Sequence, residues 1–339
     1  MPGKHLHILV IRLSAMGDVA MTVPVLRALI DQYPNVKLTV LTTQLFKPFF
    51  RDLVNTKVFV ADVKGVHKGV FGLYKLSKEL KLLHINAVAD LHNVLRSNIL
   101  KCFFSGYNFV QIDKGRKEKK GLVSGKSFRQ LKTTHERYAE VFEKLGFPID
   151  LSGPKFPARV LLNTNIKSLI REKSNGLIGI APFAAHEGKM YPLDLMKQVV
   201  EVLSKDYQIL LFGGGNKEVE ALNEMAESYE NVINLAGKID LEEQLNVISN
   251  LDVMLSMDSG NAHIAAMLGV KVITLWGVTH PNAGFAPFNQ PKDYMLLSDR
   301  NKYPKIPTSV FGNKFPESYK EVSRTINPET VIDKIRSVI

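Results

Sequence analysis

The first residues with chemical potential lie near the amino terminus. Residues 6–11 form a short apolar run, and the small residues Ser14-Ala15-Met16-Gly17 then lead to Asp18 and a run with helical spacing. This order predicts a strand, a loop and a helix, and loops at the carboxyl ends of parallel strands line ligand crevices. An aspartate held there could take a proton from a hydroxyl nucleophile. The alternative is that Asp18 only caps the helix.

A second candidate site lies in the segment Met257-Asp258-Ser259-Gly260-Asn261-Ala262-His263. It follows a β-prone run at 253–256 and opens a helical pattern at 261–268. Backbone N–H groups at a helix start, a small serine and a glycine together favour a diphosphate. The competing interpretation is that Asp258 or Ser259 caps the helix and that a neighbouring carbonyl satisfies His263.

Two more segments could contact a nucleotide. The glycine turn 213–215 precedes Glu218, which stands where a dinucleotide-binding fingerprint has its third glycine, so a nicotinamide-dependent dehydrogenase is disfavoured. Glu218 could accept hydrogen bonds from a ribose, or it could be a favourable charge in the first turn of a helix. Lys189 follows the strand expected at 177–180 and could neutralise a departing phosphate, although a surface lysine fits the sequence as well.

Positive charge is concentrated in the first half of the chain. Residues 1–160 carry 26 Lys and Arg against 12 Asp and Glu, whereas residues 161–339 carry 18 against 21, within a net charge of +11. The densest run, 114–132, has eight basic residues and one acid. Such runs are usually solvated loops, and they attract anionic substrates or membrane surfaces. With Phe128 as its one aromatic residue, this run is a poor stacking platform for nucleic acid.

The elements that must position these residues alternate between strands and helices. The length of 339 residues suits two domains. Strands are predicted before and after a Pro- and Gly-marked passage at 146–158, with helical patterns between them, at 6–11, 37–42, 58–61, 87–91, 177–180, 208–212, 253–256 and 270–276. This alternation predicts two α/β domains with parallel sheets. Residues 329–338 follow Pro328 and predict a terminal helix.

Cysteine content and hydropathy exclude several classes of protein. The one cysteine, Cys102, allows neither an intramolecular disulfide nor a cysteine-based metal cage in one chain, so a reducing compartment is expected. No apolar run approaches the ~18 residues of a membrane span. The apolar run at 7–11 ends at Arg12 and is too short for a signal peptide. We therefore expect a cytoplasmic protein.

In combination these motifs resemble the bacterial heptosyltransferases of glycosyltransferase family 9. The resemblance rests on segment 12–19 with Thr22-x-Pro24, on Lys189-x-x-Pro192, and on segment 258–263 followed by 275–281. It implies a GT-B fold, in which two Rossmann-like domains face each other across a cleft. Residues 1–160 would bind the acceptor and residues 161–320 the nucleotide sugar. Residues 321–339 would form a helix that crosses back to pack on the N-terminal domain.

The resemblance also implies an activity: inverting, metal-independent transfer of heptose from ADP-heptose to the inner core of lipopolysaccharide, without a cofactor. Asp18 would be the general base, and Lys189 would contact the donor phosphates. The remaining donor contacts would come from Asp258, Ser259, Gly260 and His263 at the diphosphate and sugar, from Glu218 at the ribose, and from the backbone around Lys238 and Ile239 at the adenine.

The acceptor implied by the resemblance is a phosphorylated, acidic glycolipid of the inner leaflet. We therefore expect peripheral contact with the inner membrane and no nucleic-acid partner. Charge and position alone suggest the acceptor contacts Arg96, Lys117, Lys119, Lys120, His135 and Arg137. Two alternatives remain open. One is the same fold with another nucleotide sugar or acceptor, since segment 283–288 departs from the best-known members where the sugar could be selected. The other is a non-catalytic protein that binds polyanions.

Overall fold

The computed structural model describes residues 6–170 and 175–339. Internal contacts divide the chain into two units. The first unit comprises the chain up to Lys114 together with Thr134–Lys155, and the second comprises Gly115–Thr133 together with Phe156–Ile339. This grouping differs from the sequence-based division at residue 160, because the basic segment 115–133 belongs to the second unit.

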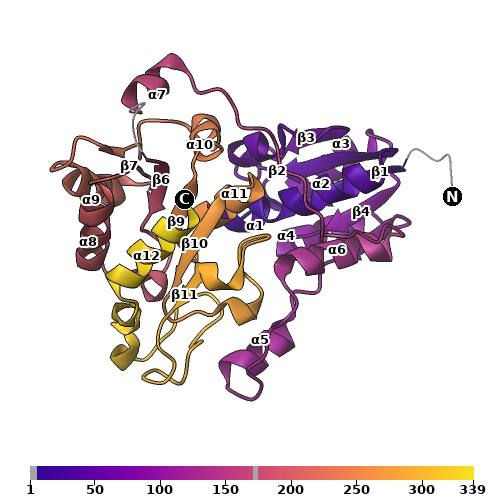
Figure 1. Cartoon of the computed structure of the whole chain (residues 1–339). Helices are drawn as coiled ribbons and strands as arrows, with labels where there is room; N and C mark the ends of the chain where they lie inside the picture. Colours follow the sequence, from indigo (N-terminus) through magenta and orange to yellow (C-terminus); the bar gives the residue numbers. More distant parts are fainter. Residues whose placement is uncertain (1–5, 171–174) are drawn as a thin grey trace. The chain divides into compact units, whose positions relative to one another are not determined.

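The first unit is built on a five-stranded parallel sheet in the order β3-β2-β1-β4-β5 (Figure 1). Its strands are β1 Leu6–Ile11, β2 Val36–Thr42, β3 Thr56–Val60, β4 Ala87–Asp90 and β5 Asn108–Gln111. Ile11 of β1 is in register with Leu41 on one side and with Asp90 on the other. The carboxyl ends of these central strands therefore lie next to one another, and the loops after β1 and β4 are neighbours.

Helices of the first unit are α1 Met16–Ala20, α2 Thr22–Gln32, α3 Gly69–Lys81, α4 Leu95–Phe103 and α6 Thr134–Lys144, with the 3-10 segment η1 Gln44–Phe50. Leucines of α3 and α4 join Leu9 and Ile11 of β1 in one buried cluster. Helix α2 contacts α6. The run with helical spacing predicted after Asp18 is divided at Met21, and Asp18 itself lies in the short helix α1.

The second unit has a six-stranded parallel sheet in the order β11-β10-β9-β6-β7-β8. Its strands are β6 Leu177–Ala181, β7 Gln208–Leu211, β8 Val232–Asn234, β9 Val253–Met257, β10 Lys271–Trp276 and β11 Met295–Leu297. Ala181 is in register with Ser256, and Met257 with Leu275. The loops after β6, β9 and β10 thus start side by side. The two parallel sheets confirm the prediction of two α/β domains.

The α-helices of the second unit are α5 Arg116–Val123, α7 Thr164–Leu169, α8 Leu193–Leu203, α9 Asn216–Ala226, α10 Leu241–Ile248, α11 Gly260–Met267 and α12 Pro328–Val338. Its 3-10 segments are η2 Glu187–Lys189, η3 Pro281–Ala283, η4 Lys292–Tyr294, η5 Glu317–Tyr319 and η6 Val322–Thr325. The solvated loop expected at 114–132 is in part the helix α5. Its one buried leucine, Leu122, packs against Leu131 and Ala283 in a small apolar cluster, although the rest of the helix is strongly charged.

The terminal helix α12 packs within the second unit, whereas the sequence prediction placed it on the N-terminal domain. Its apolar face, with Val331 and Ile335, is buried among side chains of β9 and β10. The helix also contacts α8, and Figure 1 shows it with the elements of the second unit. The hydroxyl of Tyr191 donates a hydrogen bond of 2.7 Å to the Ile326 carbonyl just before it. The apolar residues whose spacing predicts this helix thus pack in the core of the second unit.

A helix that spans a bilayer needs about 20 mostly apolar residues. None of the helices found in residues 6–170 and 175–339 has the length and apolar character needed to cross a bilayer.

Candidate functional site

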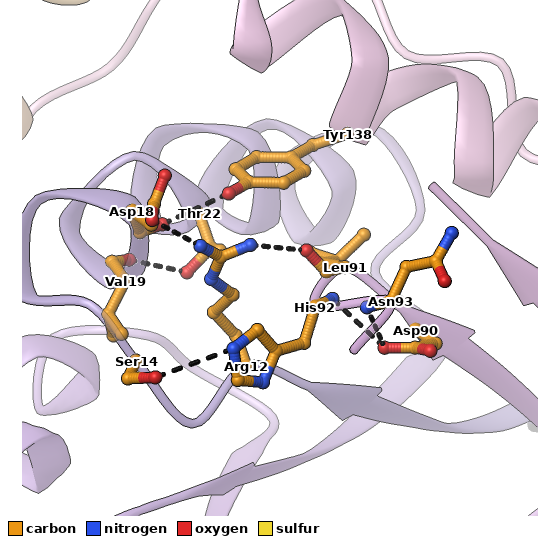
Figure 2. A network of polar contacts seen from close by, with 10 residues as sticks. All are labelled: Arg12, Ser14, Asp18, Val19, Thr22, Asp90, Leu91, His92, Asn93 and Tyr138. Atoms are coloured by element: carbon orange, nitrogen blue, oxygen red, sulfur yellow. Dashed lines mark hydrogen bonds and ion pairs between the residues drawn. The ribbon is translucent and has the colours of Figure 1, made fainter. Parts of the chain in front are cut away.

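The loop after β1 brings Arg12 and Asp18 together. A guanidinium nitrogen of Arg12 lies 2.5 Å from a carboxylate oxygen of Asp18 (Figure 2). The Arg12 side chain is 6% exposed and that of Asp18 is 33% exposed. Ala15 occupies the position that precedes α1, and Asp18 lies in the first turn, so Asp18 is not the helix cap. The carboxylate therefore has one face held by a buried cation and another open to solvent.

Arg12 is itself fixed from two other directions. Its second terminal nitrogen donates a hydrogen bond of 2.6 Å to the carbonyl of Leu91, in the loop after β4. Its Cζ atom lies 5.8 Å from the ring centroid of Tyr138 on α6, and the Tyr138 hydroxyl donates to the Asp18 carbonyl at 3.2 Å. Burial raises the pKa of Tyr138. The hydroxyl thus keeps its proton, and the Asp18 backbone is tied to α6.

The loop after β4 adds a buried histidine beside this pair. One carboxylate oxygen of Asp90 accepts hydrogen bonds of 2.9 Å from the backbone N–H groups of His92 and Asn93. His92 Nε2 lies 3.4 Å from the Ser14 hydroxyl (Figure 2). Burial, with the positive charge of Arg12, lowers the pKa of His92 to about 4. His92 is consequently neutral near pH 7.

In the second unit, the loops after β6, β9 and β10 bring Lys189, Asp258 and Thr279 together. Lys189 Nζ lies 2.8 Å from a carboxylate oxygen of Asp258 and 3.1 Å from the Asp258 carbonyl. The same carboxylate oxygen accepts a 3.0 Å hydrogen bond from the Thr279 hydroxyl. The Lys189 side chain is 16% exposed and that of Asp258 is 4% exposed. Asp258 is thus occupied by protein donors, and one face of the lysine still reaches solvent.

The segment after Asp258 starts helix α11. Ser259 stands at the cap position, but its side chain makes no capping hydrogen bond. Its hydroxyl lies 3.0 Å from the Ser256 hydroxyl. Gly260 is the first helical residue, and His263 is buried one turn into the helix. The predicted strand, turn and helix are therefore present around Ser259 and Gly260, and the helix N-terminus carries the partial positive charge that favours anions.

The other donor-site candidates lie on separate loops of the second unit. A carboxylate oxygen of Glu218 accepts a hydrogen bond of 2.7 Å from the Gly214 N–H, so this side chain holds the glycine turn after β7. Ile239 is half-buried between β8 and α10, next to the exposed Lys238. Asp240 caps α10 by accepting from the Glu243 N–H. These residues share the carboxyl-end side of the sheet with Ser259, because each follows a parallel strand.

The six candidate acceptor residues are divided between the two units. Arg96 lies on α4, and His135 and Arg137 are buried on α6, all in the first unit. Lys117, Lys119 and Lys120 lie on α5 of the second unit. Lys119 is buried, and its Nζ atom lies over the Phe285 ring, 3.9 Å from the ring centroid. Lys117 and Lys120 are exposed.

Several residues of these sites were not singled out from the sequence. Arg12 and Thr279 lie within the motifs 12–19 and 275–281. The motifs did not indicate that Arg12 pairs with Asp18 or that Thr279 donates to Asp258. Gly312 has a backbone φ of +75°, and a Cβ atom there would come within 2.6 Å of Lys189 Cγ. Glycine thus meets both a conformational and a packing requirement at this position. The sequence carries no signal for that contact, since the two residues are 123 positions apart.

Within the described ranges 6–170 and 175–339, no three His, Cys, Asp or Glu side chains lie together in a way that could hold a metal ion.

Comparison with known proteins places the chain in a family. The model for glycosyltransferase family 9 (heptosyltransferase) matches residues 73–313. The lipopolysaccharide core heptosyltransferase OpsX of Haemophilus influenzae is 24% identical over 342 aligned positions, covering 97% of this chain and 96% of that protein.

Solved structures show the same fold. The family 9 glycosyl transferase of Veillonella parvula superposes with a TM-score of 0.76 at 20% identity, covering 100% of this chain and 98% of that one. The E. coli ADP-heptose lps heptosyltransferase II superposes with a TM-score of 0.71 at 20% identity, covering 98% of each chain. These similarities confirm the predicted GT-B class with its two Rossmann-like units. The family match spans more than half of the sequence, and the chain belongs to glycosyltransferase family 9.

Proposed function

We propose that this enzyme transfers a heptose from ADP-heptose to the inner core of lipopolysaccharide, with inversion at the anomeric carbon and without a metal ion. Full-length similarity to a lipopolysaccharide core heptosyltransferase supports the substrate class. The structural observation that carries the proposal is Asp18, a partly exposed carboxylate held at the carboxyl end of β1 by Arg12. This placement suits a base that must meet a substrate hydroxyl.

Asp18 accepts the proton of the acceptor hydroxyl in this mechanism. The hydroxyl oxygen forms a bond to the anomeric carbon of the heptose as the bond from that carbon to the ADP phosphate oxygen breaks. One displacement from the opposite face inverts the configuration. The ion pair to Arg12 and the hydrogen bond from Tyr138 to the Asp18 backbone keep the carboxylate in one position. A fixed base lowers the entropic part of the barrier.

Lys189 and the start of α11 stabilise the departing ADP. The leaving diphosphate gains negative charge as the bond breaks, and the ammonium of Lys189 with the N–H groups near Gly260 would offset that charge. Asp258 holds Lys189 at 2.8 Å and receives a second donor from Thr279. We therefore assign Asp258 the task of positioning the lysine. This arrangement provides charge stabilisation from the protein's own groups.

The acceptor side of the proposal uses the basic character of the first half of the chain. The exposed Lys117 and Lys120 would contact the anionic glycolipid. The same charge would draw the enzyme to the cytoplasmic face of the inner membrane, where anionic headgroups are enriched.

Calorimetry and turnover assays test this function together. The full chain is titrated with ADP-heptose, ADP-glucose and UDP-glucose in the presence of EDTA, and transfer is then followed with a lipopolysaccharide inner-core acceptor. We expect ADP-heptose to bind best, and Asp18→Asn to lower turnover about 10²–10⁴-fold while changing donor affinity little. Unchanged turnover in this variant would remove Asp18 from the mechanism. Preference for another nucleotide sugar would change the donor.

A further inference from the structure

Three loops of the second unit meet beside Lys189, and a glycine stands at each contact. The loops follow β6, β10 and β11, and their glycines are Gly188, Gly277 and Gly312. A Cβ atom on Gly277 would lie 2.4 Å from the Gly188 carbonyl oxygen. A Cβ atom on Gly188 would lie 2.7 Å from the Gly312 carbonyl oxygen. The three backbones are therefore packed directly on one another, without room for a side chain between them.

The last of these glycines touches the side chain of Lys189. A Cβ atom on Gly312 would lie 2.6 Å from Cγ, 3.4 Å from Cδ and 3.3 Å from Cε of the lysine. The backbone of Gly312 thus runs along the stem of Lys189, whereas the ammonium group contacts Asp258. Two loops therefore hold two different parts of this lysine, one the stem and the other the charge.

Residues 308–315, which we call the clamp loop, are anchored at both ends. The Thr308 N–H donates a 3.0 Å hydrogen bond to the Val278 carbonyl, and the Thr308 hydroxyl donates one of 2.8 Å to the Lys314 carbonyl. At the other end Phe315 packs against a buried cluster that includes Val278. The clamp loop is thereby closed on itself and fixed to the segment after β10, and it presents its glycine to the lysine in one position.

Backbone conformation alone does not account for Gly312. Its φ of +75° favours glycine, as does the φ of +73° at Gly125 in the same unit. A Cβ atom on Gly125 would meet no described atom within 4 Å, so only the conformation favours glycine there. At Gly312 a Cβ atom would have to displace the middle of the Lys189 stem. The two glycines thus share a conformation and differ in this contact.

We propose that the clamp loop positions Lys189 for the phosphates of ADP, with Gly312 as a positioning residue that acts through the lysine. The inference rests on the proposed contact between Lys189 and the donor phosphates. A free lysine side chain loses rotamer freedom when its ammonium binds an anion. A stem already held along a fixed backbone loses less, and its charge is placed in advance. The clamp loop therefore raises ADP affinity through the lysine.

Calorimetry with ADP and with adenosine tests the role of Gly312. Gly312→Ala should raise the Kd for ADP about fivefold, because the added methyl group displaces the lysine stem. It should leave the Kd for adenosine unchanged, since adenosine has no phosphate. Gly125→Ala brings the same backbone strain without that contact, and it should bind both ligands as the wild type does. Equal weakening of ADP and adenosine by Gly312→Ala would show general damage to the nucleotide site and overturn the proposal.

The same substitution in a chain without the lysine shows whether Gly312 acts through it. In Lys189→Ala, the change Gly312→Ala should produce no further rise in the Kd for ADP. A rise as large as in the wild type would contradict the proposal. Wild-type ADP affinity in Lys189→Ala would remove the phosphate contact and the inference together. Weakened binding in Lys189→Ala with wild-type binding in Gly312→Ala would overturn the inference alone.

A substitution at Thr308 decides the question if circular dichroism shows that Gly312→Ala is unfolded. Thr308→Val removes the hydroxyl that closes the clamp loop onto the Lys314 carbonyl. We expect it to raise the Kd for ADP about two- to threefold, and to have no effect in Lys189→Ala. Thr308→Ser keeps the hydroxyl and should restore wild-type affinity. Wild-type ADP affinity in Thr308→Val, or equal weakening by valine and serine, would contradict a role for the anchored loop.

Discussion

A guanidinium nitrogen of Arg12 lies 2.5 Å from a carboxylate oxygen of Asp18, although the two side chains differ greatly in exposure. The arginine is buried between the Leu91 carbonyl and the Tyr138 ring, whereas the aspartate reaches solvent. The buried partner therefore sets the position, and the exposed partner presents an oxygen. This division of tasks between a fixed cation and an accessible base is what a preorganised proton acceptor requires.

Replacing Arg12 tests that division. Lysine keeps the charge but lacks the planar fork that reaches Asp18 and Leu91 at once. We expect Arg12→Lys to lower kcat about 10²-fold through a displaced carboxylate and to leave the Kd for ADP unchanged.

Arg51→Lys is the matched control, since Arg51 also lies beside a carboxylate, at 3.8 Å from Asp52, in the same unit. It should keep full activity. Wild-type kcat in Arg12→Lys would show that the ion pair serves only the fold.

Loss of Lys189 should weaken ADP binding. The Lys189→Ala variant removes a cation from the proposed diphosphate site, and we expect the Kd for ADP to rise about 10- to 100-fold. Lys197→Ala removes a half-exposed lysine of the same unit that is 3.9 Å from Glu224, and it should leave the Kd unchanged. Calorimetry with ADP separates the two. An unaltered Kd in Lys189→Ala would move the phosphate contact elsewhere.

Thr279→Val tests the positioning role of Asp258. Valine matches the shape of threonine but removes the hydroxyl that donates to the Asp258 carboxylate at 3.0 Å. Lys189 then faces a less restrained carboxylate. We expect a smaller rise in the Kd for ADP than Lys189→Ala produces, and no added effect when the two changes are combined, because both act through the same ammonium. Full additivity would mean that Thr279 acts without the lysine.

The exposed lysines of α5 should affect the KM for the acceptor. Lys117→Glu with Lys120→Glu reverses two charges, and we expect the acceptor KM to rise about tenfold at low salt and less at high ionic strength. Lys64→Glu with Lys75→Glu makes the same change at exposed positions of the first unit and should have little effect. An equal rise in KM for both pairs would assign the effect to overall charge.

The sequence was sufficient for the central strands and for most helices. Runs such as Leu6–Ile11 and Lys271–Trp276 are β-branched, apolar and bounded by turn residues, so local pattern alone identifies them. The strands β5, β8 and β11 were missed because each is four residues or shorter and lies toward a sheet edge. Such strands owe their pairing to the neighbouring strand, and a short run carries little local signal.

The candidate sites were likewise predictable only where the signal is local. Asp18 and Arg12 belong to one short motif, and Asp258 is a candidate because it directly precedes a predicted helix. The pairing of Lys189 with Asp258 joins residues 69 positions apart, and no spacing rule reports it. Helix α5 was obscured by its charge, since the burial of Lys119 depends on Phe285, which follows much later in the chain. Contacts between residues far apart in the chain therefore determine these features, and a local sequence pattern does not report such contacts.

The stability of the fold should depend on pH through two buried histidines. Burial lowers the pKa of both His92 and His280 to about 4, from 6.5 in the unfolded chain. Below pH 6.5 the unfolded chain binds protons that the folded chain does not, so the free energy of unfolding falls as pH decreases from about 6.5 to about 4 and levels off below that range. We expect uptake of up to about one proton per histidine on unfolding. Urea titrations between pH 4 and 7 measure this slope. His92→Gln should reduce it, and His84→Asn, at an exposed histidine of the same unit, should reduce it less. Equal slopes for the wild type and His92→Gln would mean that His92 protonates alike in both states.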